Sequence, residues 1–169
     1  MKIVAIGSNL ELPGIGGPAE VCEAALKRLE TAGVAVSARS GWYRSAPVPA
    51  SDQPDFINGI LSVSWEAGPE ALMVKLHEIE NEFGRIRSVP NAARTLDLDL
   101  IDYDGMVREG VGSPVLPHPR MRGRAFVLMP LSELAPGWRH PVHGAPVATL
   151  LAALPPGQEC VRTEPADRG

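Results

Sequence analysis

The run Arg94-Thr95-Leu96-Asp97-Leu98-Asp99-Leu100-Ile101 alternates leucine with aspartate, which is the pattern of a β-strand with one apolar face. In a β-strand, residues two apart point to the same face, so Asp97 and Asp99 project side by side while the leucines face the other way. Two such carboxylates on a mostly buried strand stay ionised only beside positive charge. Oxygen-only ligands favour Mg²⁺ or Mn²⁺ over zinc. The run therefore predicts a strand that carries a metal site, and the alternative is a solvated edge strand with alternating polar residues.

The composition predicts an ordinary globular protein. The chain has 169 residues, 44% hydrophobic and 21% charged, which fits a single domain over residues 1–169. A net charge of −4 argues against nucleic-acid binding, and the apolar residues 3–6 are too few for a signal peptide or a membrane span. Cys22 and Cys160 have no metal-type spacing, so we expect a cytoplasmic protein. The tail, rich in Pro, Gly and charge, is expected to fray from about residue 160.

Alternating patterns divide the chain into strands and helices. Strands are expected over residues 2–6, 34–43 and 56–66 besides the carboxylate run, and helices over 19–31, 69–83, 125–134 and 147–154. Asp104-Gly105 is a strong hairpin signal and predicts a return strand over 106–108. Because the elements interleave and a hairpin requires an antiparallel pair, we predict an α/β fold of the α+β kind, with helices on a mixed sheet.

Arginines gather around the two carboxylates. Within residues 85–124 the cationic side chains are all arginine, and no lysine occurs. Because guanidinium makes bidentate contacts to phosphate, this cluster predicts a polyphosphate held between metal and arginine. For any single arginine the alternative is a surface ion pair. The cluster consists of Arg85, Arg87, Arg94, Arg108, Arg120, Arg122 and Arg124.

Two common nucleotide-binding motifs do not account for a phosphate site. The chain contains no Gly-Lys pair, so it has no P-loop. Residues 14–19 imitate a dinucleotide fingerprint but lie too far beyond the first strand, and no acidic residue ends the next strand where the ribose partner belongs. We therefore interpret residues 11–18 as a loop and expect the arginine and aspartate cluster itself to hold the nucleotide.

Several motifs in the same order resemble the 6-hydroxymethyl-7,8-dihydropterin pyrophosphokinase family over roughly residues 3–141. The resemblance implies a ferredoxin-like fold, a mixed but mainly antiparallel sheet with helices on both faces. It also implies transfer of pyrophosphate from ATP to the hydroxymethyl group of 6-hydroxymethyl-7,8-dihydropterin, releasing AMP, in folate biosynthesis. The expected partners are these two small molecules, without nucleic acid or membrane, and we expect a monomer. Besides Arg94 to Asp99, the motifs are Ile6-Gly7-Ser8-Asn9-Leu10, Trp42-Tyr43-Arg44-Ser45-Ala46-Pro47, Asp52-Gln53-Pro54-Asp55-Phe56-Ile57-Asn58, Glu80 with Gly84-Arg85-Ile86-Arg87, and Leu116-Pro117-His118-Pro119-Arg120-Met121 with Arg124-Ala125-Phe126.

The resemblance also implies roles for individual residues. Asp97 and Asp99 would hold two Mg²⁺ ions that bridge the ATP phosphates, with Arg85 and Arg94 as the other catalytic residues. The nucleotide and its phosphates would be contacted by His77, Glu80, Arg87, His118 and Arg124. The pterin would be contacted by Ser45, Ala46, Val48, Phe56, Asn58, Asn91 and Phe126, its ring lying between the two phenylalanines and its edge on Asn58.

The chain departs from the family pattern in several places. The segment between Arg87 and Arg94 is a residue shorter than in some members, Asn91 stands where some members have an aromatic residue, and His77 stands where others have Gln. The loop over residues 11–18 also has little of the acidic pattern expected after Gly-Ser-Asn. On the residues alone, two other classes stay open: another Mg²⁺-dependent nucleotide-using transferase with an Asp-x-Asp site, and a non-catalytic ATP-binding module. The first would not need the phenylalanines and Asn58, and the second would be expected to lack a carboxylate or an arginine.

Overall fold

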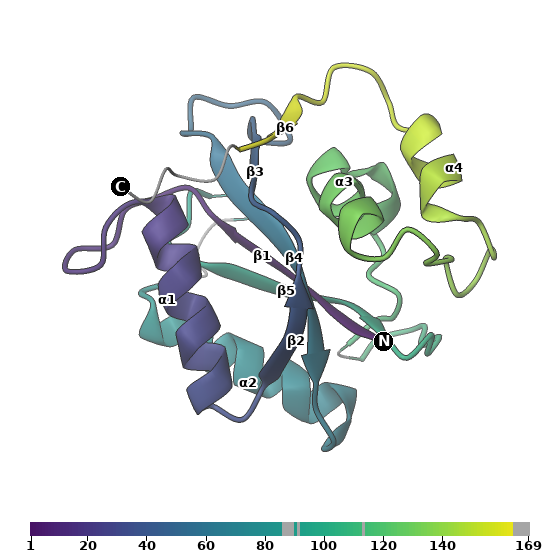
Figure 1. Ribbon diagram of the computed structural model, residues 1–169, viewed down its shortest axis with the longest axis horizontal. Coiled ribbons are helices and arrows are strands. Elements are labelled where there is room, and N and C mark those ends of the chain that lie inside the picture. The colour runs from purple at the N-terminus through teal and green to yellow at the C-terminus, as the bar shows by residue number, and fades with distance from the viewer. Residues whose placement is uncertain (86–89, 91, 113, 164–169) are drawn as a thin grey trace.

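The computed structural model describes residues 1–85, 90, 92–112 and 114–163 (Figure 1). Its strands join in one sheet, and its helices lie against the two faces of that sheet. The strands are β1 (Lys2–Ser8), β2 (Ala35–Arg39), β3 (Tyr43–Ser45), β4 (Phe56–Ser64), β5 (Asp97–Tyr103) and β6 (Cys160–Arg162). The helices are α1 (Pro18–Thr31), α2 (Gly68–Glu82), α3 (Ala125–Leu134) and α4 (Val147–Ala152), with a short 3₁₀ turn over Met121–Gly123.

The sheet has the strand order β5-β1-β4-β3-β6, and β2 also pairs with β4. β1 lies between β5 and β4, where its Ala5 is opposite Ile60 of β4 and Asp99 of β5. All pairings among the described strands are antiparallel, so the sheet is more uniform than the mixed one predicted. The succession β1-α1-β2-β4-α2-β5 with this strand order confirms the ferredoxin-like class.

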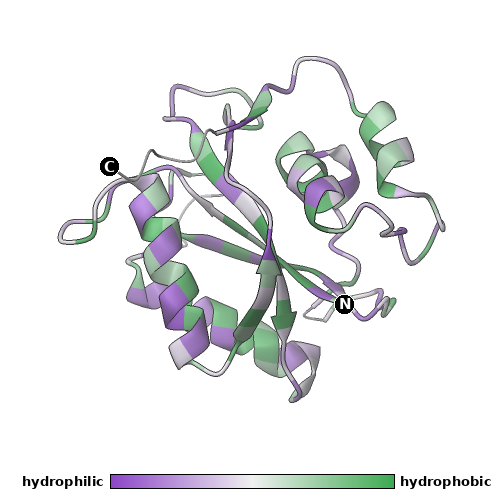
Figure 2. Ribbon diagram, in the orientation of Figure 1, coloured by the Kyte–Doolittle hydropathy of each residue, from purple (hydrophilic) through white to green (hydrophobic). Residues whose placement is uncertain are grey.

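Helices cover both faces of the sheet, as predicted (Figure 1). On one face, α1 and α2 bury one stripe of apolar residues each against the sheet, and Figure 2 shows these stripes beside hydrophilic ones. On the other face, Leu128 and Leu131 of α3 pack with Ile3, Ile60 and Ile101 of three strands. Each such fully buried side chain contributes about 1.5–3 kcal/mol of transfer free energy, so the two cores together fix how the helices sit on the sheet.

The position of β5 between these cores decides where its carboxylates point. Leu98 and Leu100 are buried in the core under α1 and α2. Asp97 and Asp99 therefore face the side of the sheet that carries α3. The predicted alternation of this strand is confirmed, and it places both carboxylates on the face where the sheet is only partly covered by a helix.

Residues 34–43, predicted as one strand, form two. β2 ends at Arg39 and β3 begins at Tyr43. Between them the Ser40 hydroxyl accepts a hydrogen bond from the Ile60 N–H at 3.0 Å, and the Gly41 N–H donates to Glu133 of α3. The Ser40 N–H still donates to the Ile60 carbonyl at 2.9 Å, but side chains take the other hydrogen bonds of this stretch, so the regular strand pairing stops there.

The predicted return strand over residues 106–108 is wrong, although the turn itself forms. Asp104 and Gly105 both have positive φ, and the Met106 N–H donates to the Tyr103 carbonyl. The chain then leaves the sheet. At the edge of β5, the His118 N–H donates to the Ile101 carbonyl at 2.8 Å in place of a return strand.

Two further differences concern the second half of the chain. The predicted helix over 125–134 agrees with α3, whereas the helix over 147–154 ends earlier, as α4. Residues 160–162, where we expected the tail to fray, pair with β3 as β6. No described helix is long and apolar enough to cross a membrane.

Candidate active site

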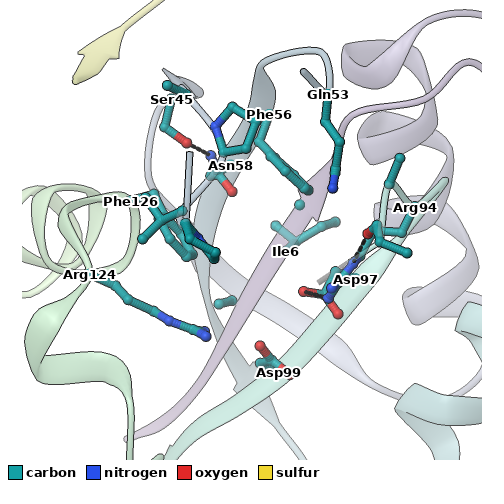
Figure 3. A pocket seen from close by; sticks show the side chains of 18 of the residues that line it. Ile6, Ser45, Gln53, Phe56, Asn58, Arg94, Asp97, Asp99, Arg124 and Phe126 are labelled. Atoms are coloured by element: carbon teal, nitrogen blue, oxygen red, sulfur yellow. Dashed lines mark hydrogen bonds and ion pairs between the residues drawn. The ribbon is translucent and has the colours of Figure 1, made fainter. Parts of the chain in front are cut away.

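A pocket of about 330 Å³ opens on the face of the sheet that carries Asp97 and Asp99 (Figure 3). Its size lies in the range of small-molecule sites. Segments far apart in the sequence line it, and most residues predicted for the site are among them. These are Ser45, Ala46, Val48, Phe56, Asn58, Arg85, Arg94, Asp97, Asp99, Arg124 and Phe126. We call Arg85, Arg94, Asp97, Asp99 and Arg124 the charged end of the pocket, and Ser45, Phe56, Asn58 and Phe126 its aromatic end.

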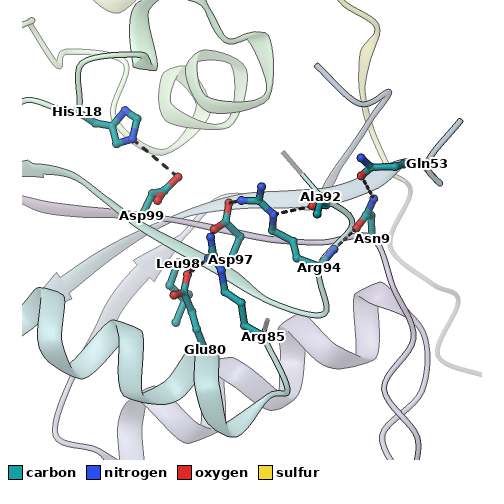
Figure 4. Close-up of polar contacts among 10 residues, drawn as sticks. All are labelled: Asn9, Gln53, Glu80, Arg85, Ala92, Arg94, Asp97, Leu98, Asp99 and His118. Atoms are coloured by element: carbon teal, nitrogen blue, oxygen red, sulfur yellow. Dashed lines mark hydrogen bonds and ion pairs between the residues drawn. The ribbon is translucent and has the colours of Figure 1, made fainter. Parts of the chain in front are cut away.

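Asp97 is held by two arginines. Its Oδ1 accepts from Arg85 Nη1, and its Oδ2 accepts from Arg94 Nη1 at 2.9 Å (Figure 4). Although burial lowers the pKa of Arg85, the charges of Asp97 and Glu80 outweigh this and raise it. Arg85 therefore stays positive, and Asp97 fixes the direction of both guanidinium groups before any ligand arrives.

Glu80 lies beneath this cluster, on α2, and its side chain is only 1% exposed. Its Oε1 accepts from Arg85 Nη1 and from the Leu98 N–H of β5, the latter at 2.7 Å. A buried carboxylate needs such partners. Glu80 is not a lining residue of the pocket, and its position favours orienting Arg85 rather than meeting the nucleotide.

Asp99 differs from Asp97 because, among the described residues, no arginine lies within ion-pair distance of its carboxylate. Burial is the largest cause and the charge of Asp97 the second of a rise in the pKa of Asp99 to about 6. The two carboxylates thus repel each other, and a cation between them would relieve that repulsion. Mg²⁺ is bound through one or two carboxylates together with substrate phosphates, so these oxygen donors fit that ion. Among the described residues, no group of three or more His, Cys, Asp or Glu could hold a metal alone.

His118, Arg120 and Arg124 approach the pocket from the other side. Burial, followed by the charges of Arg124 and Arg120, lowers the pKa of His118 to about 4, so His118 is neutral at pH 7. Its Nε2 lies 4.0 Å from Asp99 Oδ2. Arg124 points toward Asp99 in Figure 3, and neither Arg120 nor Arg124 has a carboxylate within 4 Å in the described part of the chain. This side of the pocket therefore carries positive charge that no described acid neutralises.

The aromatic end consists of two rings with an amide between them (Figure 3). Asn58 is buried, and its Nδ2 donates to Ser45 Oγ at 2.8 Å, which fixes the direction of the amide. A Cβ on Gly7 of β1 would lie 3.0 Å from the Asn58 Oδ1, so the glycine leaves room for that oxygen. Phe56 and Phe126 come from β4 and α3 and both line the pocket. A flat polar heterocycle fits between rings and amide.

Some predicted residues lie elsewhere. His77 is half-buried on α2 and, like Glu80 and His118, does not line the pocket, so a contact of these residues with the nucleotide stays a prediction. Arg87 and Asn91 lie outside the described residues, so their predicted roles stay untested.

Sequence reasoning gave no role to Asn9. Its Nδ2 donates to Gln53 Oε1 and to the Pro54 carbonyl, and its Oδ1 accepts from the Arg94 N–H at 2.8 Å. Asn9 thus links the loop before Phe56 to the segment before β5 (Figure 4). The available signal was its place after Gly7-Ser8, where the buried strand β1 ends and a polar side chain needs partners.

Comparison with known proteins agrees with this geometry. A family model described as 7,8-dihydro-6-hydroxymethylpterin-pyrophosphokinase matches residues 3–136. A 2-amino-4-hydroxy-6-hydroxymethyldihydropteridine pyrophosphokinase of Pseudomonas aeruginosa is 41% identical over 156 residues, covering 90% of this chain and 90% of that protein. One of Synechocystis sp. is 39% identical over 150 residues, covering 88% and 73%.

A solved structure shares the fold. Wild-type HPPK-DHPS of Plasmodium falciparum superposes with a TM-score of 0.65 at 12% sequence identity, over 89% of this chain and 44% of that one. The chain spans less than half of that longer protein, and at this identity the likeness concerns the fold alone. The match of the family model over most of the chain is the stronger finding: this chain belongs to the 7,8-dihydro-6-hydroxymethylpterin-pyrophosphokinase family.

Proposed function

We propose that the chain transfers pyrophosphate from ATP to the hydroxymethyl group of 6-hydroxymethyl-7,8-dihydropterin, releasing AMP in folate biosynthesis, and that both substrates meet in this pocket. The family match supports the reaction. The observation that carries the site is that one cavity joins a pair of carboxylates and several arginines to two phenylalanine rings around a fixed amide. Another Asp-x-Asp transferase would have no use for the aromatic end.

The aromatic end is proposed to hold the pterin. Phe56 and Phe126 would take the faces of the ring, since flat π-systems stack on aromatic side chains. The Asn58 Oδ1 accepts a hydrogen bond from the ring edge, because its Nδ2 is already engaged by Ser45. Ala46 and Val48, which line the same cavity, would contribute backbone and apolar contacts. This arrangement directs the hydroxymethyl group toward Asp99.

The charged end is proposed to hold the triphosphate. Arg85, Arg94 and Arg124 present guanidinium groups to the cavity from different elements, which suits the three-dimensional spread of phosphate oxygens. Neutral His118 serves there as a hydrogen-bond partner rather than as a cation. Pyrophosphoryl transfer asks mainly for positioning and charge neutralisation, and these side chains supply both.

Asp97 and Asp99 are proposed to hold two Mg²⁺ ions, which supply polarisation of the phosphate oxygens and stabilisation of the leaving group when bound. Before binding, Arg85 and Arg94 neutralise Asp97. The hydroxymethyl oxygen attacks the β-phosphorus and releases its proton to solvent, the bond from the β-phosphorus to the bridging oxygen of the α-phosphate breaks, and AMP leaves with that oxygen from the opposite side. Asp99 is the carboxylate of the charged end that no arginine engages, so it is the one placed to orient the attacking hydroxyl.

One assay tests this function: AMP release from ATP at saturating Mg²⁺, with and without 6-hydroxymethyl-7,8-dihydropterin, with product identified by mass. Pterin-dependent AMP and a pyrophosphorylated pterin are expected. ADP as the product, or ATP binding without turnover, would instead support a different transferase or a binding module. We also propose that the protein acts as a cytoplasmic monomer, which light scattering with fractionation of cells tests.

A further inference from the structure

The first residue before α3 is unusual for its position. Arg124 is the N-cap of α3, and no side chain of the cap residue bonds to the first turn. Ser, Thr, Asp and Asn are preferred there because their oxygens accept from the free N–H groups of the helix start. Arginine offers no acceptor. Its side chain instead extends into the charged end of the pocket, so α3 needs its capping oxygen from somewhere else.

That oxygen comes from Gln158, in the connection between α4 and β6. Gln158 Oε1 accepts from the Ala125 N–H at 2.9 Å, and its Nε2 donates to the Gly123 carbonyl at 2.8 Å. These two hydrogen bonds hold the backbone on either side of Arg124. One half-buried amide thus holds the peptide that carries a residue of each end, Arg124 and Phe126.

The segment after Gln158 is itself fixed to the opposite wall of the pocket. In β6, Cys160 pairs with Ser45 of β3, the residue whose hydroxyl orients Asn58. The Thr163 N–H donates to the Trp42 carbonyl just before β3, while Arg162 Nη2 donates at 3.1 Å to Glu133 Oε1 near the end of α3. Residues 158–163 therefore connect the β3 wall to the start of α3 (Figure 1).

We propose that Gln158 is a positioning residue for the pyrophosphoryl transfer. It supplies the hydrogen-bond acceptor at the start of α3 that Arg124 lacks, and it holds the backbone so that the Arg124 side chain extends into the pocket. The inference rests on the proposed function. Gln158 lies beyond residues 3–136, the part matched by the family model, and is not among the residues that line the pocket. It acts through the Gly123–Phe126 backbone.

The direct test replaces Gln158 by Ala and compares it with Glu159→Ala, an exposed neighbour for which the structure shows no hydrogen bond or ion pair of the side chain within the described residues. Gln158→Ala should lower kcat/KM for the pterin roughly tenfold at 25 °C, the size expected when an orienting hydrogen bond is lost. Glu159→Ala should match the wild type. Thermal unfolding curves confirm that both variants are folded at the assay temperature.

A double-mutant cycle separates positioning from a general loss of stability. If Gln158 acts through Arg124, the effect of Gln158→Ala on kcat/KM should largely vanish in an Arg124→Ala background. Equal effects of Gln158→Ala in both backgrounds would overturn the inference, as would a kcat/KM equal to that of Glu159→Ala.

Hydrogen exchange gives a readout that needs no activity. In Gln158→Ala the amide of Ala125 should exchange at least tenfold faster than in the wild type and in Glu159→Ala. Unchanged exchange would overturn the proposed cap. If the wild type shows no pterin-dependent AMP release, the proposed function fails, and the exchange result still decides whether Gln158 holds the start of α3.

Discussion

Apart from Arg124, the charged end of the pocket is built from nearby pieces of chain, whereas the aromatic end is assembled from distant ones. Arg94, Asp97 and Asp99 follow one another closely, and Arg85 lies just beyond the end of α2, the helix that packs beside them. Ser45, Asn58 and Phe126 come from three elements that meet only in the folded sheet. The charged end is also cross-linked by ion pairs, while the aromatic end depends on one amide–hydroxyl bond. Substitutions at the two ends should therefore fail in different ways.

The largest effect is expected at the two carboxylates. Asp97→Asn and Asp99→Asn should each lower kcat by on the order of 10²-fold or more, since each removes a charge that stabilises the transition state. Steady-state rates at saturating Mg²⁺ measure this. Asp104→Asn is the matched control, because Asp104 follows the same strand but pairs with Lys2 away from the pocket. Near-normal turnover in either site variant would contradict the metal assignment.

Removal of a ring should affect one substrate only. Phe56→Ala and Phe126→Ala should weaken pterin binding by roughly 1–3 kcal/mol each, the range found for bases stacked on aromatic side chains. ATP affinity of the same variants is the internal control and should stay within twofold. Calorimetric titration with each ligand separately measures both. Equal losses for pterin and ATP would mean that the rings serve the core and not the ligand.

Asn9→Ala should affect both ends to a smaller degree. Asn9 ties the loop before Phe56 to Arg94, so its loss leaves polar groups of both segments unpaired. We expect a destabilisation of about 1–3 kcal/mol in urea unfolding and moderate increases in KM for both substrates. Asn81→Ala, at an exposed position near the end of α2, is the control. A change in KM for one substrate alone would argue against a link between the ends.

The smallest effect is a pH dependence of stability in the absence of metal. The pKa of Asp99 is raised to about 6 in the folded protein, above its ordinary value near 4, so the folded state holds the proton more tightly. This contribution to stability is fully present below pH 4 and is lost as the pH rises through 6. Between pH 4 and pH 7, the urea midpoint in EDTA should therefore fall further for the wild type than for Asp99→Asn. Parallel pH curves for the two proteins would contradict the raised pKa.

Predictions from local pattern succeeded where burial alone sets the structure. The phase of β5, with Leu98 inward and Asp97 outward, follows from alternation, and the bounds of α3 follow from its apolar run. Prediction failed where a distant group takes over a backbone bond. Ser40 interrupts a strand by binding Ile60, and His118 occupies the edge of β5 that the return strand was expected to fill.

The same distinction holds for the site. Motif resemblance brought most pocket residues together, from Ser45 to Phe126, without geometry. It could not show that Glu80 turns toward Arg85 and β5, because that depends on how α2 packs. Asn9 and Gln158 were missed for a related reason. Their partners lie far away in the sequence, and no local periodicity marks an amide that bonds to backbone across the fold.

The arginine at the start of α3 carries an evolutionary consequence. Selection for stability alone would place Ser or Asp at position 124, since such a cap is worth about 1 kcal/mol in a typical helix. The chain keeps an arginine whose side chain serves the pocket, and the helix depends on an amide 33 residues downstream. A screen that ranks variants by melting temperature would therefore favour replacing Arg124 and would discard the function, as trade-offs between stability and activity lead us to expect. Positions 124 and 158 should therefore change together in evolution, while β6 stays paired with β3 whichever residue stands at position 124.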